Sequence, residues 1–188
     1  MNNMKTDQIN EIELMKRLGS GEMEALSEIV KKYQDKVLAI AYRFCNDWSK
    51  SEDIAQETFL RIYKAAGNYT PRAKFTTWLY RIVVNLCLDE QRKQTKAPIS
   101  IEEVDYNGAV DSESNSIERK ETIELVKKAI HELPERQRLA VILHRYQNLS
   151  YEQISEVTQW TKSSVESLLV RAYANLRQKL SKIEKIME

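Results

Sequence analysis

The amino-acid sequence predicts an all-α protein, made of two small helical domains that a flexible acidic linker joins. Glycine and proline are scarce, with four and three among 188 residues. Glu, Lys, Leu, Ile and Ala are abundant, which favours helices and leaves a sheet few turn residues. Apolar residues recur at helical spacing on both sides of a central polar segment, and no stretch shows a convincing strand pattern.

The first predicted domain, residues 10–96, contains four helical patterns. Ser49 and Glu52 have the spacing of a capping box, which predicts that the third helix starts near residue 50. Pro71 excludes a helix across the turn before the fourth. The apolar periodicity places the four helices at residues 9–18, 23–44, 50–67 and 75–94.

The linker, residues 97–118, is distinguished by its charge. It carries six acidic residues and no Lys or Arg. Residues 22–96 carry 13 basic and 10 acidic side chains, a net +3, and residues 119–188 carry 13 and 9, a net +4. Residues 98–116 lack a helical period and are rich in Ser, Asp and Asn, which predicts a flexible connection between domains that sit apart on a larger partner.

The second predicted domain, residues 119–188, ends in a recognisable arrangement of helices. Ser150 and Gln153 form a second capping-box pattern before a short helix, residues 151–158. A tight turn follows, and Thr161 or Ser163 then caps a long final helix. Preceded by a support helix that Pro134 opens, this is the layout of a helix-turn-helix.

The first turns of the final helix would face the major groove of DNA. Serine, lysine and arginine suit phosphate contacts, arginine can also pair with guanine, and glutamate can accept a hydrogen bond from cytosine. The alternative is an ordinary helical hairpin whose polar face is solvated. The outward residues are Lys162, Ser163, Ser164, Glu166, Ser167, Val170 and Arg171.

The stretch "KFTTWLYRIVVNLCLDEQRKQTK", residues 74–96, combines an apolar face with polar features that a core helix would not need. Trp78 and Tyr80 lie near the helix start, beside the basic loop "NYTPRAKF", and aromatic side chains can stack on unpaired bases. Asn85 lies on a polar stripe and could hydrogen-bond a base edge. The alternative is a core helix with a satisfied asparagine and a solvated basic end.

The stretch "SEDIAQETFLRIYKA", residues 51–65, presents a largely acidic stripe. Asp53 and Glu57 are four residues apart on one face, with the apolar Phe59 and Tyr63 beside them. Catalysis is not expected, because no His, Cys, Ser or glycine-rich loop converges on the carboxylates. A docking face for helices of another protein is the favoured function, and a merely solvated face is the alternative.

Other sequence features narrow the class of protein. Cys45 and Cys87 fall within apolar helical patterns, which favours two buried thiols over a disulfide. His131 and His144 stand alone, so we expect no metal, cofactor or small-molecule substrate. The chain has no apolar run of about 18 residues and no signal-peptide pattern, and we expect a cytoplasmic protein.

The motifs, in this order, resemble the small extracytoplasmic-function group of bacterial sigma-70 factors. "EDIAQETFLRIY" resembles region 2.2, and "KFTTWLYRIVVNLCLDEQRK" resembles regions 2.3 and 2.4, which melt and read the −10 promoter element. "LPERQRLAVILHRYQNLSYEQISEVTQWTKSSVESLLVRAYANLRQKL" resembles region 4, whose helix-turn-helix reads the −35 element. The resemblance covers residues 10–96 and 119–182.

The resemblance implies three sets of binding residues. Those for core RNA polymerase, through the β′ clamp helices, are Asp53, Gln56, Glu57, Phe59 and Tyr63. Those for the −10 element, including a loop that captures a flipped base, are Asn68, Tyr69, Arg72, Lys74, Phe75, Trp78, Arg81, Asn85, Arg92 and Lys93. Those for the −35 element are the outward residues of the final helix given above. The family often has basic residues where this chain has Glu166, Leu168 and Tyr173.

The resemblance also implies partners and regulation. Core polymerase, through its β′ clamp helices and β flap, and promoter DNA are the expected partners. Such factors respond to stress and are commonly held inactive by an anti-sigma factor, often membrane-anchored. Because the first domain carries a net charge of only +3, we expect the chain alone to bind promoter DNA poorly.

Two other classes of function remain open at this point. A helix-turn-helix regulator that binds duplex DNA without polymerase would leave the acidic 51–65 face unexplained. A helical protein–protein adaptor would have no effect on DNA at all. An enzyme is the least favoured class.

Overall fold

The computed structural model describes residues 2–94 and 117–187, and every regular element in those ranges is helical. The predicted linker lies almost wholly outside the described residues. In chain order the elements are α1 (Asn2–Gly19), α2 (Met23–Cys45), α3 (Trp48–Ala65), the 3₁₀ turn η1 (Ala66–Asn68), α4 (Phe75–Gln94), α5 (Ile117–His131), α6 (Glu135–Val141), the π-helical η2 (Ile142–Tyr146), α7 (Tyr151–Thr158) and α8 (Lys162–Met187). The all-α prediction is confirmed.

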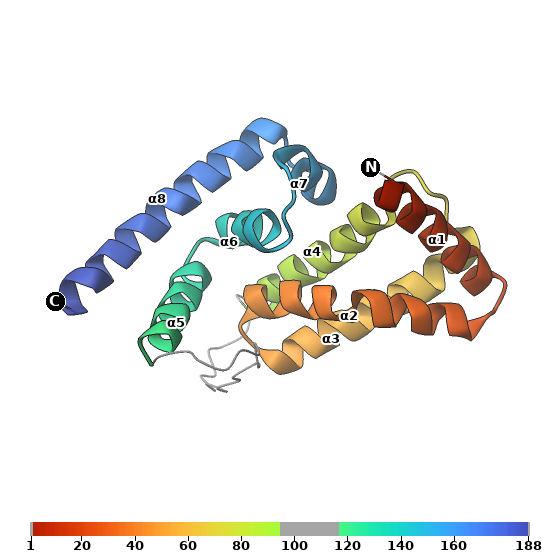
Figure 1. Ribbon diagram of the computed structural model, residues 1–188, viewed down its shortest axis with the longest axis horizontal. Coiled ribbons are helices and arrows are strands. Elements are labelled where there is room, and N and C mark those ends of the chain that lie inside the picture. The colour runs from red at the N-terminus through yellow and green to blue at the C-terminus, as the bar shows by residue number, and fades with distance from the viewer. Residues whose placement is uncertain (1, 95–116, 188) are drawn as a thin grey trace.

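The first domain packs α1 to α4 around a core to which every helix contributes (Figure 1). Tyr33 of α2 lies in its centre, with its ring 5.3 Å from that of Phe75 on α4. The Tyr33 hydroxyl donates a hydrogen bond to Glu11 of α1, and Lys32 Nζ lies 3.1 Å from the same carboxylate. These contacts give the buried Glu11 both a donor and a counter-charge, as a carboxylate removed from water requires.

The start of α3 differs from the prediction. The cap is Asp47, whose side chain accepts a hydrogen bond from the Lys50 backbone N–H at 3.0 Å, and the helix begins at Trp48 rather than near residue 50. Ser49 therefore lies inside the first turn and is not the N-cap. Asn46 adopts the left-handed conformation at φ 53° and ends α2, which lets Asp47 serve as the cap after a single turn residue.

Gly19, where α1 ends, is required by a close approach of two backbones. A Cβ at this position would lie 2.8 Å from the carbonyl oxygen of Ala66 in η1. We expect Gly19→Ala to destabilise the protein by about 1–3 kcal/mol, as overpacking does, and to lower Tm by about 2–12 °C. Thermal unfolding followed by circular dichroism measures this. Gly67→Ala is the matched control, because its Cβ would meet nothing within 4 Å; equal effects of the two would refute the clash.

The second domain has the predicted helix-turn-helix. The Ser150 and Gln153 capping box is present, with side chain and backbone bonded in both directions, and α7 has the predicted bounds. Gln159 adopts the left-handed conformation at φ 60°, which makes the turn. Of the two predicted caps of α8, Thr161 is the one that accepts a bond from the Ser164 N–H, at 3.2 Å.

The two domains pack directly against each other. α7 contacts α4, while α5 and η2 contact α2 near its end (Figure 1). The buried hydrophobic side chains of both domains form one continuous cluster. The cysteines lie near this junction, and both are free; Cys87 is buried as predicted, whereas Cys45 is half-buried. A hydrogen bond with Cys45, together with burial, raises the pKa of the Cys87 thiol.

His131, at the end of α5, lies in the same junction. Burial and the nearby charge of Arg138 on α6 lower the pKa of His131, against smaller opposing effects of a hydrogen bond to the backbone of Cys45 and of the charge of Glu132. The unfolded chain therefore binds a proton more readily than the folded one, so this contribution to stability is lost as pH falls below the ordinary value of 6.5.

We accordingly expect Tm to fall between pH 7.5 and pH 5.5, and to fall less in His131→Gln. The carboxylates whose pKa values are shifted do not explain a fall in Tm between pH 7.5 and pH 5.5. Their pKa values are lowered, so these carboxylates titrate below that range. Calorimetry at both pH values measures the difference. His144→Gln is the control, and an identical pH dependence in wild type and His131→Gln would contradict the assignment.

Candidate polymerase and nucleic-acid interfaces

The acidic stripe of α3 lies on the outside of the first domain. Asp53 and Gln56 are exposed, and Tyr63 is 46% exposed, while Ile54, Ala55 and other residues of the opposite face enter the core. The helix therefore separates a polar surface from an apolar one, as the sequence predicts. Solvent-accessible apolar area beside carboxylates suits contact with another protein.

Glu57, in this stripe, forms an ion pair with a neighbour on the same helix. Its carboxylate accepts a hydrogen bond from Arg61 Nε at 2.8 Å, four residues on, and this bond lowers the pKa of Glu57. Phe59 is half-buried and packs against the core. It is consequently a smaller part of the exposed face than Tyr63.

An aromatic cluster forms where the loop after η1 meets the start of α4. The ring of Trp78 lies 5.0 Å from that of Tyr69 and 5.7 Å from that of Phe75. Trp78 and Tyr69 are half-buried, whereas Phe75 is only 1% exposed. The cluster can offer the two half-buried rings to a base, and Phe75 supports them from the core.

Most of the polar residues predicted to bind the −10 element are exposed, on the loop before α4 and along α4 itself. Tyr80 does not belong with them: it is 6% exposed, and its hydroxyl donates to Gln147 Oε1 of the second domain at 3.2 Å. Tyr80 was expected to stack on bases, but in this structure its ring is buried and cannot contact them. The exposed members of the predicted set are Asn68, Arg72, Lys74, Asn85, Arg92 and Lys93.

Arg81, one turn before Asn85 on α4, already has a partner. Its Nη2 donates a hydrogen bond to the backbone carbonyl of Glu156 in α7 at 2.6 Å. Asn85 is exposed, and Arg92 forms an ion pair with Asp89 at 3.2 Å. The predicted −10 stripe is thus partly covered by the second domain.

The first turns of α8 project from the second domain as a helix-turn-helix requires. Six of the seven predicted residues are exposed, and Ser164, which the Thr161 cap engages, is half-buried. Val165, Leu169 and Ala172 form the buried face of the helix. The Arg171 Nε donates to the carbonyl of Ser167, four residues earlier, at 3.1 Å.

Two contacts link the start of α8 and the turn before it to the neighbouring helices α7 and α6. Lys162, at its start, forms an ion pair with Glu152 of α7, and this bond lowers the pKa of Glu152 to about 2. Arg136 of α6 lies over the ring of Trp160 in the turn, 4.5 Å from its centroid. The turn that precedes the recognition helix is thereby fixed against the support helix.

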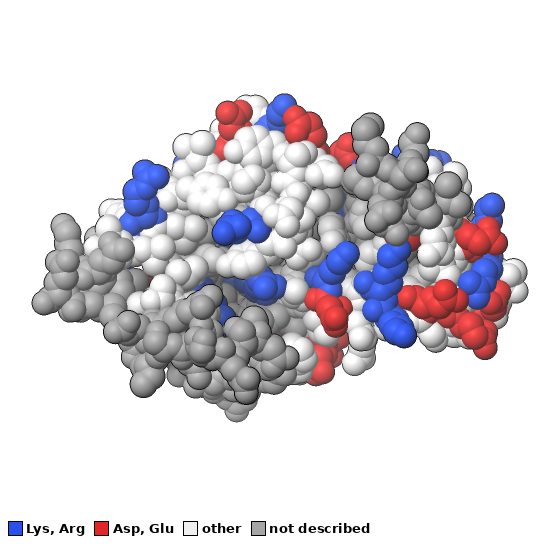
Figure 2. Space-filling model, viewed as in Figure 1, with Lys and Arg blue, Asp and Glu red and all other residues white. Residues whose placement is uncertain are grey.

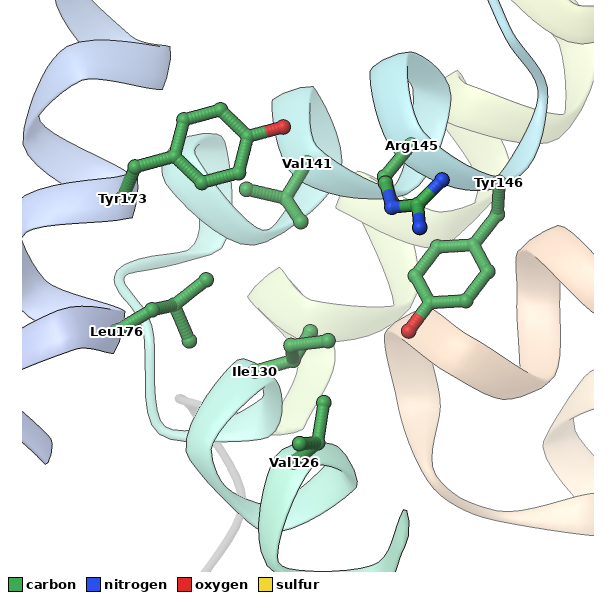
Figure 3. A pocket seen from close by; sticks show the side chains of 7 residues that line it. All are labelled: Val126, Ile130, Val141, Arg145, Tyr146, Tyr173 and Leu176. Carbon is green, nitrogen blue, oxygen red and sulfur yellow. The ribbon is translucent and has the colours of Figure 1, made fainter. Parts of the chain in front are cut away.

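Sequence reasoning did not identify an apolar groove of about 500 Å³ in the second domain. Side chains from α5, α6, η2 and α8 line it, as Figure 3 shows. Tyr146 and Tyr173 at its edge are each 37% exposed. The helical spacing of Val126 and Ile130 indicates that they share one face of α5. Only the packing of the other helices shows that this face lines the groove. The lining residues are Val126, Ile130, Val141, Arg145, Tyr146, Tyr173 and Leu176.

The surface charge is mixed. On the face shown in Figure 2, Lys and Arg side chains are dispersed among acidic and uncharged ones, without one continuous basic patch among the described residues. Non-specific affinity for DNA depends on phosphate neutralisation by clustered cations. The described residues also hold no group of three His, Cys, Asp or Glu that could bind a metal, and none of the described helices is long and apolar enough to cross a membrane.

Comparison with known proteins identifies both domains. Residues 29–97 match the family model of sigma-70 region 2, and residues 123–176 match that of sigma-70 region 4. The RNA polymerase sigma-H factor of Pseudomonas aeruginosa is 32% identical over 170 residues, 85% of this chain and 88% of the relative. The ECF RNA polymerase sigma factor SigW of Bacillus subtilis is 29% identical over 179 residues, 88% and 94% of the two chains.

Solved structures agree at the level of the fold. The chain of CnrH, in complex with the cytosolic domain of CnrY, superposes with a TM-score of 0.69 at 21% identity, covering 92% of this chain and 98% of that one. The sigma factor RpoE of Bartonella quintana, in complex with the anti-sigma factor NepR, gives 0.68 at 22% identity, covering 82% and 96%.

A two-domain helical chain with region 2 followed by region 4 is a sigma-70 factor, and this chain belongs to that family. Within it, the relatives place the chain among the extracytoplasmic-function, or ECF, sigma factors.

Proposed function

We propose that this chain is an alternative sigma factor that binds core RNA polymerase and directs promoter-specific initiation. In this proposal, residues 10–96 dock on the polymerase and both read and melt the −10 element. Residues 119–188 read the −35 element, and residues 97–118 form the linker between the two domains. The observation that carries the proposal is the coexistence, in one chain, of the exposed α3 face, the aromatic cluster at α4 and the helix-turn-helix. A duplex-binding regulator would need only the last of these.

The chemistry of promoter melting supports the assignment of α4. Extruding a base from the duplex costs a few kcal/mol, which stacking on Trp78 and Tyr69 and hydrogen bonds from Asn85 can offset. Basic side chains around the cluster bind the backbone of the separated strand. Because the 29 Lys and Arg are balanced by 28 Asp and Glu and lie dispersed on the face that Figure 2 shows, tight binding requires the polymerase.

In transcription from a fragmented genomic template, we expect core polymerase with this chain to make transcripts that core polymerase alone does not. The chain alone should bind the same promoters weakly. Tight duplex binding without polymerase dependence would favour the regulator instead. A chain that changes neither transcription nor DNA binding would favour an adaptor.

We further propose control by an anti-sigma factor. Structures similar in fold were solved in complex with such partners, CnrY and NepR. The groove of Figure 3 and the exposed face of α3 are apolar and acidic surfaces that a helical inhibitor could cover. Affinity capture of the chain from its own cells, followed by mass spectrometry, tests this; recovery of polymerase alone would count against it.

A further inference from the structure

We propose that a pocket between α1 and the loop before α4 binds a second unpaired base of the separated DNA strand, next to the base that the aromatic cluster takes. The inference rests on the proposed function and extends it, because it brings α1 into the −10 interface. The residues that the sequence predicts for the −10 element all lie at residue 68 or beyond, so none of them belongs to α1.

The pocket has a volume of about 300 Å³ and lies where α1 meets η1. Ile12, Met15, Lys16 and Gly19 line it at spacings of three and four residues, so one face of α1 forms one wall. Met15 is fully buried and Ile12 is half-buried, which makes this wall largely apolar. Pockets that enclose small ligands have volumes from about 300 Å³ upwards. This pocket therefore suits a ligand as small as one base.

Tyr69 connects the pocket to the aromatic cluster. It lines the pocket, and its ring also lies 5.0 Å from that of Trp78. A strand with one base stacked on Trp78 can therefore place a neighbouring base in the pocket without leaving the surface. Burial, together with the charge of Glu11, raises the pKa of Tyr69. Its hydroxyl consequently stays neutral and does not repel a phosphate.

Gly67 indicates that a ligand approaches the backbone here. Two of the four glycines of the chain, Gly19 and Gly67, line this pocket. Gly19 is required by the close approach of α1 to Ala66, as described above. Gly67 has no such requirement, because its φ lies outside the left-handed region and a Cβ there would meet nothing within 4 Å. Glycine in a helical turn is less stable than alanine, so space for a ligand beside the backbone explains Gly67 better than the fold does.

The charges around the pocket favour a nucleic-acid strand as its occupant. Lys16, at the pocket, is exposed, and so are Arg72 and Lys74 of the loop that carries Tyr69. No acidic side chain is among the described residues that line the pocket. An apolar wall, an aromatic ring and nearby cations are the combination that binds single strands, because they serve the base and the phosphates at once.

The test is a scan with abasic sites on a fork-junction DNA whose unpaired tail carries the −10 sequence. The full chain, in complex with core polymerase, is titrated with tails that each lack one base. We expect large losses of affinity at two positions, about 5- to 150-fold at each, which is what one stacked base contributes. One position belongs to the aromatic cluster and the other to the pocket.

Two variants assign the positions. In Trp78→Ala, removal of the base at the cluster position should cost nothing further. In Gly67→Leu, whose side chain occupies the pocket, the same should hold at the other position only. Each loss is a ratio of two affinities of the same complex, so a general weakening of binding cancels. Thr70→Leu adds the same side chain at an exposed loop residue that does not line the pocket, and should leave both losses unchanged.

A surface variant decides the question if circular dichroism shows that Gly67→Leu does not fold. Lys16→Met removes one cation, and should reduce by about 0.7 the slope of the logarithm of affinity against the logarithm of salt concentration. Lys31→Met, at an exposed lysine of α2 that does not line the pocket, should leave the slope unchanged. The slope reports contact with a phosphate, which a merely structural lysine would not provide.

Several results would overturn the second base site. They are a single sensitive position in the tail, a Gly67→Leu variant that changes neither loss or changes the one that Trp78→Ala marks, and an unchanged salt slope in Lys16→Met. If the pocket instead receives a helix of another protein, Gly67→Leu lowers the overall affinity while both losses remain.

The proposed function fails in a different way. A chain that gives core polymerase no affinity for the fork junction removes the sigma-factor assignment, and the pocket proposal with it. A chain that gives this affinity but shows one sensitive position keeps the assignment and removes only the second base site.

Discussion

Replacing Asp53, Gln56 and Glu57 together by alanine is expected to weaken binding to core polymerase by about 30- to 1000-fold. Interface residues that matter cost roughly 1 kcal/mol or more each when truncated, and charged ones also slow association. The three side chains lie on the outer face of α3, away from the core, so the fold should survive. Fluorescence titration with core polymerase measures the affinity, and circular dichroism checks the helix content.

The chain offers a matched control for this triple variant. Glu24, Gln34 and Asp35 are the same three residue types, and all three are exposed on α2. Their replacement by alanine changes the net charge equally but leaves the α3 face intact. Unchanged polymerase affinity in the α3 triple, or an equal loss in both triples, would remove the docking assignment and leave a solvated acidic stripe.

Asn85→Ala is expected to reduce open-complex formation by about 10- to 100-fold, the discrimination that one good base contact supplies. The affinity for core polymerase should be unchanged, because Asn85 is an exposed residue of α4 and lies outside the proposed docking face on α3. Permanganate footprinting of the melted promoter measures opening, and the titration above measures docking. Asn10→Ala, at an exposed asparagine of α1, is the control.

Separation of the two readouts is what supports the role of Asn85. A parallel loss of docking and opening would indicate a folding defect. Normal opening in Asn85→Ala would assign recognition to Trp78 and Tyr69 without a contribution from the asparagine. Because Asn85 lies one turn from Arg81, a normal rate of opening would also make Arg81, which bonds to the second domain in this structure, the next residue to test.

Local signals in the sequence determined where most helices begin and end. The Ser150–Gln153 pair is confirmed as a capping box, and α4 and α7 have the predicted bounds, because a cap or a proline acts within one turn of chain. The start of α3 shows the limit of such signals. The sequence predicted Ser49 as the cap, whereas the left-handed turn at Asn46 places Asp47, two residues earlier, in that position.

Which face of each helix meets solvent was only partly predictable. The helical periodicity distinguished the polar stripe of α3 from its core face. An amphipathic helix buries its apolar face, so the polar residues on the opposite face are exposed. It could not show that Phe75 and Tyr80 point inward, because aromatic residues suit both a core and a base-stacking surface. The groove beside Tyr173 was likewise invisible, since it is a gap among four elements.

The sequence by itself determined two helical domains, the order of their motifs and the family to which they belong. Only the tertiary structure decided that these domains close on each other through Arg138, Tyr80 and Arg81. The physical reason is range. Caps, turns and periodicity act between residues a few positions apart, whereas the bond from Arg138 to Phe44 joins residues 94 positions apart, and no local pattern specifies such a partner.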